Sequence, residues 1–302
     1  MSQQVVLVGV DGSPTSAAAL AWGLEAAAAR GAAVEALHAW HWDRTFLGMV
    51  VPETPVELAV GARHGVEAEL EKALADRPAG SLAVPAWSHT AEGDPADVLL
   101  QHARSADLLV LGRHGQSAWQ RKLVGPALGS VAGTCLSRST APVAVVPPEA
   151  RPIPPDRIVV GVDGSDSSLR ALRWAAQHAE RVGRPVVAVL SWQLTSLPTP
   201  PAARDSWAPP LEEWEELGRS LLDETVSKVP ESDSVEQVLL HRPAASGLLE
   251  TVGPDDLLVL GERGRGGFTR LLLGSVSRQC VEHAPCPVVV VPPRDRSVSP
   301  EQ

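Results

Sequence analysis

The sequence predicts an α/β protein made of two tandem, doubly wound domains, each a five-stranded parallel sheet flanked by helices. The length of 302 residues, of which 44% are apolar, suits two domains that each bury a core. The segment VVLVGVDGS at 5–13 returns as RIVVGVDGS at 157–165, so the chain is a duplication. Each half alternates Val/Leu runs with Ala-rich stretches, and such alternation is typical of parallel sheets with helical crossovers.

The first half predicts its elements in the order βαβαβαβαβ. VVLVGV at 5–10 is continuously apolar, as expected of a strand covered on both faces. A helix follows, with Ser13 as N-cap, Pro14 in its first turn and Gly31 as its end. The later elements are a strand at 34–42, a helix at 56–75, a strand at 82–89, a helix at 95–106, a strand at 107–112, a helix at 130–139 and a strand at 142–146.

The second half repeats this pattern at an offset of 152, which pairs Asp11 with Asp163 and Trp40 with Trp192. Near the end of each half, DLLVLGRHG at 107–115 matches DLLVLGERG at 256–264. PPEARPIPPD at 147–156 separates the halves, and its prolines favour an extended connector. We therefore expect domains at 1–150 and 151–302.

Two motifs fall where a doubly wound sheet binds ligands. Asp11 and Asp163 directly follow the first strands, and Gly112 and Gly261 directly follow the fourth strands. If these strands are neighbours at the reversal of winding, both motifs face one crevice beyond the carboxyl ends of the strands. Capping of the next helix is an alternative role for the two aspartates.

The second half carries a glycine loop, in which Gly261, two residues, Gly264, nine residues, Gly274 and Ser275 follow one another. Glycines let main-chain N–H groups approach an anion closely, and the next helix favours phosphate at its N-terminus. We expect Ser275 to cap that helix, and Arg263 to add positive charge.

Together, VGVDGS and G-x2-G-x9-G-S resemble the universal stress protein family, specifically its ATP-binding branch, on an adenine nucleotide alpha hydrolase-like fold. The resemblance implies that the acidic residue contacts adenosine, that a residue ending strand two packs by the adenine, and that the glycine loop holds the phosphates. It implies ATP as the bound nucleotide, alone or with Mg²⁺. The implied positions, with Gly164 and Arg263 beside them, are Asp163, Ser191, Gly261, Gly264, Gly274, Ser275 and Val276.

The first half departs from this motif, because thirteen residues separate Gly115 from Gly129. Either Gly125 is the third glycine, with Pro126 in place of a hydroxyl residue, or four residues are inserted and Gly129 with Ser130 is retained. Arg121 and Lys122 either supply charge to phosphate or lie on a solvated loop. The candidate positions in this half are Asp11, Ala39, Gly112, Gly115, Gly129 and Ser130.

The family resemblance favours a nucleotide-dependent regulator of the stress response. GxSxG, HExxH and P-loop signatures are absent from the sequence, and we expect Glu262 in the glycine loop to point to solvent rather than act as a base. The alternative is an enzyme that uses an adenine nucleotide for hydrolysis or for substrate adenylylation. We expect no metal site, since His38 and His41 point to opposite faces of an extended strand.

Composition limits the partners. A net charge of −10 argues against nucleic-acid binding, and no apolar window reaches the ~18 residues of a membrane span. Three cysteines without a CxxC pair indicate reduced thiols and a cytoplasmic protein. The resemblance also implies that PVAVV at 142–146 and PVVVV at 287–291 pair in an intramolecular pseudo-dimer. A homodimer and an unidentified protein partner are further expectations.

Overall fold

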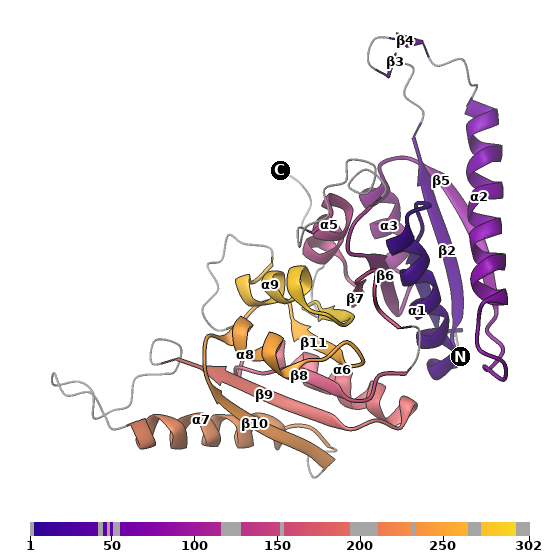
Figure 1. The fold of residues 1–302 in the computed structure, drawn as a ribbon. Helices are drawn as coiled ribbons and strands as arrows, with labels where there is room; N and C mark the ends of the chain where they lie inside the picture. Colours follow the sequence, from indigo (N-terminus) through magenta and orange to yellow (C-terminus); the bar gives the residue numbers. More distant parts are fainter. Residues whose placement is uncertain are drawn as a thin grey trace. The chain divides into compact units, whose positions relative to one another are not determined.

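The computed structural model describes residues 3–41, 45–46, 49–50, 55–115, 128–151, 154–193, 211–230, 234–264 and 273–293. The chain separates into two compact units between Pro154 and Pro155, within the proline-rich connector. Both units are α/β (Figure 1).

The first unit contains a five-stranded parallel sheet, as the sequence predicts, and its strand order is β5-β2-β1-β6-β7. Its strands are β1 (Val5–Gly9), β2 (Ala33–Trp40), β5 (Ala86–Glu92), β6 (Leu108–Gly112) and β7 (Val143–Val146). Its helices are α1 (Pro14–Arg30), α2 (Pro55–Ala75), α3 (Pro95–Ala103) and α5 (Ser130–Arg138). A short antiparallel hairpin, β3 (Thr45–Phe46) and β4 (Met49–Val50), follows β2 and was not predicted.

The second unit repeats this architecture, with its parallel strands in the order β10-β9-β8-β11-β12. Its strands are β8 (Ile158–Gly161), β9 (Val186–Trp192), β10 (Val235–His241), β11 (Leu257–Gly261) and β12 (Val288–Val291). Its helices are α6 (Asp166–Val182), α7 (Leu211–Val226), α8 (Ala244–Thr251) and α9 (Ser275–His283).

Helices cover both faces of the first sheet (Figure 1). A Cβ on Gly23 of α1 would lie 2.7 Å from the Val8 side chain, whereas a Cβ on Gly9 would meet Leu99 of α3. Neighbouring strand residues point to opposite faces, so α1 and α3 lie on opposite sides of β1. Burial on both faces explains why β1 is a continuous apolar run without alternation.

Capping residues set the ends of α1 as expected. The Ser13 hydroxyl accepts a hydrogen bond from the Ser16 N–H, and Gly31 ends the helix in the left-handed conformation at φ 61°. Ser165 and Gly183 occupy the same positions around α6, with φ 64° at the glycine. The duplication therefore extends to the signals that begin and end each helix.

The third strand of the first unit differs from its predicted range of 82–89. β5 begins only at Ala86, directly after Pro85, and continues to Glu92. The Pro85 carbonyl accepts from the Val34 N–H, but proline has no N–H to extend the ladder. β5 is the edge strand of its sheet, and its burial alternates along the chain.

Among the described helices, none is both long and apolar enough to cross a bilayer. Cys135, Cys280 and Cys286 are buried thiols, and no disulfide joins them. Burial raises the pKa of Cys135 and of Cys280 to about 12.

Candidate functional site

The first and fourth strands of each unit are neighbours, which meets the condition under which both sequence motifs face one crevice. β1 pairs with β6 in the first unit, and β8 pairs with β11 in the second. Because all four strands are parallel within their units, Asp163 and Gly261 emerge at one edge of the second sheet, and Asp11 and Gly112 at one edge of the first. This edge is the candidate site in each unit.

In the second unit, Asp163 shapes the turn that follows β8. Its Oδ1 accepts a hydrogen bond from the Ser165 N–H at 3.0 Å, and the Ser165 hydroxyl accepts from the Ser168 N–H at 3.1 Å. The N-cap of α6 is therefore Ser165, and the capping role considered for Asp163 is wrong. Gly164 lies between them at φ 76°, a left-handed conformation that L side chains rarely adopt. The first unit has the same turn around Asp11.

The carboxylate of Asp163 lies directly against the glycine loop. A Cβ added to Gly264 would be 2.5 Å from Asp163 Oδ2, closer than any ordinary contact. In the first unit, a Cβ on Gly115 would lie 2.9 Å from Asp11 Oδ2. Glycine at this position is what lets the backbone of the loop approach the carboxylate.

The loop of the second unit closes through its third glycine. The Gly274 N–H donates to the Glu262 carbonyl at 2.9 Å, and the Gly274 carbonyl accepts from the Arg278 N–H in the first turn of α9. Gly274 is thus the N-cap, with no side-chain cap hydrogen bond, and Ser275 is the first helical residue. The expectation that Ser275 caps α9 is wrong, because the extended conformation of an N-cap belongs to Gly274.

The same closure identifies the third glycine of the first unit. The Gly129 N–H donates to the Arg113 carbonyl at 2.9 Å, and α5 begins at Ser130. Gly129 and Ser130 therefore correspond to Gly274 and Ser275, which favours the insertion over the alternative third glycine. The residues of that alternative, Gly125 and Pro126, lie outside the described part of the chain, as do Arg121 and Lys122.

The two loops differ in the residue after their first glycine. In the second unit this residue is Glu262, which is 3% exposed and has its Oε1 3.5 Å from Nε of Arg263. The expectation that Glu262 points to solvent is wrong, because its N–H still bonds the Val291 carbonyl of β12 and so holds it at the sheet. The corresponding residue of the first unit is Arg113, which is also buried.

A second carboxyl, that of Glu69 in α2, lies near the first site. Burial raises the pKa of the Glu69 carboxyl, the negative charge of Asp11 raises it further, and Lys72 lowers it. The first unit therefore places two acidic groups within electrostatic reach of each other at its candidate site.

In each unit, a side-chain hydroxyl that the sequence analysis did not identify joins the loop after the fourth strand to the helix after the first strand by a hydrogen bond. Thr15 of α1 donates to the His114 carbonyl, and the Ser167 hydroxyl of α6 accepts from the Arg263 N–H at 3.4 Å. The two residues are related by the same offset of 152, which is the signal that could have revealed them.

The remaining predicted positions lie around the same strand ends. Ser191 is near the end of β9, where its hydroxyl donates to the Arg242 carbonyl at 2.9 Å. Ala39 is near the end of β2, and Val276 is the second residue of α9. Ala39 has no hydroxyl, so the first unit lacks the bond that Ser191 makes.

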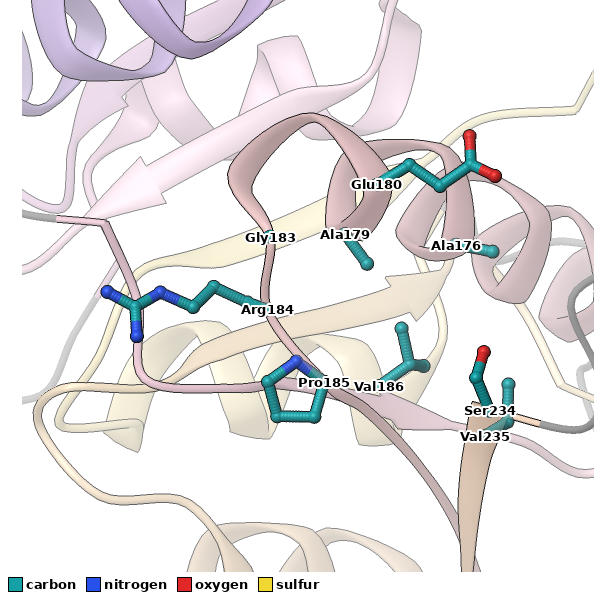
Figure 2. A pocket seen from close by; sticks show the side chains of 9 residues that line it. All are labelled: Ala176, Ala179, Glu180, Gly183, Arg184, Pro185, Val186, Ser234 and Val235. Carbon is teal, nitrogen blue, oxygen red and sulfur yellow. The ribbon is translucent and has the colours of Figure 1, made fainter.

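A hollow in the second unit lies away from this edge. Figure 2 shows it between the last turn of α6 and the starts of β9 and β10, where Gly183, Pro185 and Val235 contribute to its lining. The starts of β9 and β10 are at the opposite edge of the sheet from Asp163, and none of the predicted site residues lines the hollow.

With this geometry established, comparison with known proteins decides the family. The sequence model of the Universal stress protein family matches this chain twice, at residues 3–147 and 155–292. The chain belongs to the universal stress protein family.

Relatives of the same tandem length support this membership. A universal stress protein of Mycobacterium tuberculosis is 32% identical over an alignment of 320 positions, which covers 97% of this chain and 96% of that protein. A universal stress protein of Mycolicibacterium smegmatis is 32% identical over 300 residues, covering 96% and 97%. The crystal structure of a universal stress protein from Archaeoglobus fulgidus shares the fold, with a TM-score of 0.63 at 17% identity over 98% of this chain and 100% of that one.

Proposed function

We propose that this universal stress protein binds ATP in its second unit, between the Asp163 turn and the glycine loop, and acts as a nucleotide-dependent regulator in the stress response. The observation that carries the proposal is the close approach of Asp163 Oδ2 to Gly264, where an added Cβ would lie 2.5 Å from that oxygen. It puts a carboxylate, suited to the hydroxyls of a ribose, beside a loop whose amides suit phosphate.

The start of α9 supports the phosphate part of the proposal. The first amides of a helix have no partner within the helix, and they carry its positive dipole end. At α9 the N-cap is Gly274, so no side chain caps these amides. An anion seated there gains the hydrogen bonds that a serine or aspartate cap would otherwise take. Arg263, in the same loop, is 40% exposed at its side chain and adds positive charge.

The residues of the loop favour a regulator over an enzyme. Among the described residues of the loop, Glu262 is the carboxylate, and it is buried beside Arg263 rather than presented to a water nucleophile. A nucleotide held by both Asp163 and α9 would bias the loop toward one conformation and so change its contacts with a protein partner. The size of that bias is the difference in nucleotide affinity between the two conformations.

The first unit has the same turn at Asp11 and the same loop closure at Gly129, but the acidic groups around its site are less favourable for an anionic ligand. Glu69 lies near Asp11, and the inserted residues lengthen the loop. We propose that the second unit is the principal site. Pairing of the last strands in a pseudo-dimer stays a prediction from the family resemblance.

Calorimetric titration of ATP into the full chain, with and without Mg²⁺, tests the proposal. Asp163→Asn should lower the affinity at least tenfold, equivalent to about 1.4 kcal/mol, while the matched Asp11→Asn should leave the principal site unchanged. Mass spectrometry of the native protein counts nucleotide carried from the cell. Absence of saturable heat for the folded wild type, or equal affinity for Asp163→Asn, would refute the proposal.

A further inference from the structure

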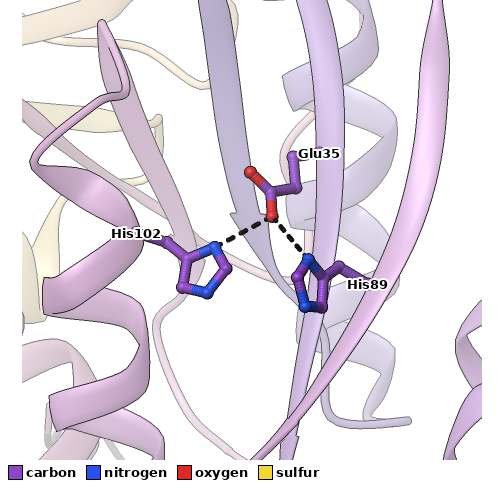
Figure 3. Close-up of side chains that lie close together, drawn as sticks. All are labelled: Glu35, His89 and His102. Atoms are coloured by element: carbon purple, nitrogen blue, oxygen red, sulfur yellow. Dashed lines mark hydrogen bonds and ion pairs between the residues drawn. The ribbon is translucent and has the colours of Figure 1, made fainter.

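Outside the nucleotide site, the first unit brings together a carboxylate and two imidazoles from three different elements. Glu35 lies on β2, His89 on β5 and His102 in the last turn of α3. Both rings point at the same carboxylate oxygen in Figure 3: Glu35 Oε1 is 2.9 Å from Nδ1 of His102 and 3.3 Å from Nδ1 of His89. The two rings meet edge to face, with centroids 4.9 Å apart.

We propose that Glu35, His89 and His102 form a binding site for a divalent transition-metal ion, and specifically for Zn²⁺. Two imidazoles and one carboxylate are a donor set that zinc accepts, with a fourth position left for water. Calcium and magnesium, in contrast, prefer oxygen ligands throughout.

The distances fit such an ion. Ligands about 2.0 to 2.1 Å from a tetrahedral zinc lie about 3.3 Å from one another. Here one ligand atom from each residue lies within 4.8 Å of the other two. The distance from Glu35 Oε1 to Nδ1 of His89, 3.3 Å, equals that separation, and the 2.9 Å hydrogen bond to Nδ1 of His102 would have to lengthen by about 0.4 Å to admit the ion. Neutral imidazoles can carry their proton on Nε2, which leaves both Nδ1 lone pairs for the ion.

The burial of Glu35 supports a positive partner. Its side chain is 14% exposed on a strand in the interior of the sheet, where a lone carboxylate is costly to desolvate. His102 is 22% exposed and His89 is 47% exposed, so one side of the cluster stays open to the entry of an ion. A bound zinc would offset the cost of the buried charge and would tie the edge strand β5 to α3.

The second unit shows that the fold does not require these residues. Glu35 pairs with Leu7, and the equivalent pairing in the second unit places Val187 beside Val159. His89 pairs with Leu37, and the equivalent position is Val238 beside Val189. The second unit has valines at the positions equivalent to Glu35 and His89 and still forms the same sheet. The polar cluster therefore distinguishes the first unit from the second.

The site is also separate from the nucleotide edge. Glu35 is the third residue of β2 and His102 is in the last turn of α3, which runs back toward the starts of the strands. Asp11 and the glycine loop lie beyond the carboxyl ends of the strands. Zinc binding can therefore be measured independently of ATP.

The test is equilibrium dialysis of the untagged full chain against Zn²⁺ alone, with Co²⁺ absorption as a second readout. The proposal expects one ion per chain, and a tenfold or greater loss of affinity in each of His89→Gln, His102→Gln and Glu35→Gln. His64→Gln, which changes an exposed histidine of α2, is the matched control and should bind as wild type.

The cobalt spectrum should lack a thiolate charge-transfer band, because the three cysteines are buried elsewhere. Zinc should also raise the melting temperature of wild type and of His64→Gln, but not of His102→Gln. Circular dichroism establishes that each variant is folded. Failure of the wild type to take up zinc, or unchanged uptake in a folded His89→Gln and His102→Gln pair, would overturn the proposal.

Discussion

Gly264→Ala changes the contact on which the proposed nucleotide site depends. The added Cβ would lie 2.5 Å from Asp163 Oδ2, and real Cβ atoms essentially never approach within 3.0 Å of another atom. The carboxylate or the loop must therefore move by at least 0.5 Å, the difference between these distances.

The displacement acts through a hydrogen bond that the carboxylate already makes. Asp163 Oδ1 accepts from the Ser165 N–H at 3.0 Å, so a carboxylate shift of 0.5 Å directed away from that N–H would lengthen this bond to about 3.5 Å, the limit of hydrogen bonding. A hydrogen bond to a charged group contributes about 1.5 to 3 kcal/mol. The bond would be partly lost, and Oδ2 would leave the position from which it contacts the nucleotide. Together these changes should reduce ATP affinity by about tenfold, or ~1.4 kcal/mol.

Isothermal titration calorimetry of the full chain measures this change, and thermal unfolding shows whether the variant is folded. Gly115→Ala is the matched control, since its Cβ would lie 2.9 Å from Asp11 Oδ2 in the first unit. We expect it to leave the principal site unchanged. If folded Gly264→Ala binds ATP within twofold of wild type, the carboxylate contact does not organise the site.

Two further predictions concern the folded chain. Cys135, Cys280 and Cys286 are fully buried, so an aromatic disulfide reagent should label none of them in the native protein and all three after unfolding; rapid native labelling would contradict the described packing. The pKa of the Glu69 carboxyl is raised above its ordinary value of 4.5, so the folded state binds the carboxyl proton more tightly than the unfolded state does. The stability that this protonation contributes is present below pH 4.5 and is lost as the pH rises through the folded pKa. Glu69→Gln should therefore be more stable than wild type in chemical denaturation at pH 7, with the gain disappearing below about pH 4.5, and equal stability at both pH values would refute this reasoning.

The sequence was sufficient for the order of the elements and for the edge that holds the site. Continuous apolar runs predict strands buried on both faces, and Ser13 and Gly31 mark a helix through their own backbone preferences. Asp163 and Gly261 each follow a strand directly, so they meet if those two strands are neighbours, and the pairing of β8 with β11 in the structure supplies that condition.

Loop closure could not be read from spacing, because Gly125 and Gly129 both offered a plausible third glycine. Only the hydrogen bond from the Gly129 N–H to the Arg113 carbonyl identified Gly129 as the residue that closes the loop and stands at the N-cap of α5. In the same way, Gly274 rather than Ser275 is the N-cap, because capping depends on where the loop returns to the strand.

The sequence by itself thus determined what local patterns encode: the duplication, the strands and helices, and the two motifs of the candidate site. Tertiary structure alone decided which distant side chains meet. Glu35, His89 and His102 come from two strands and a helix, and their approach depends on the register of β2 with β5 and on the packing of α3. Neither quantity has a local signature in the chain, because register and packing are set by burial of whole elements.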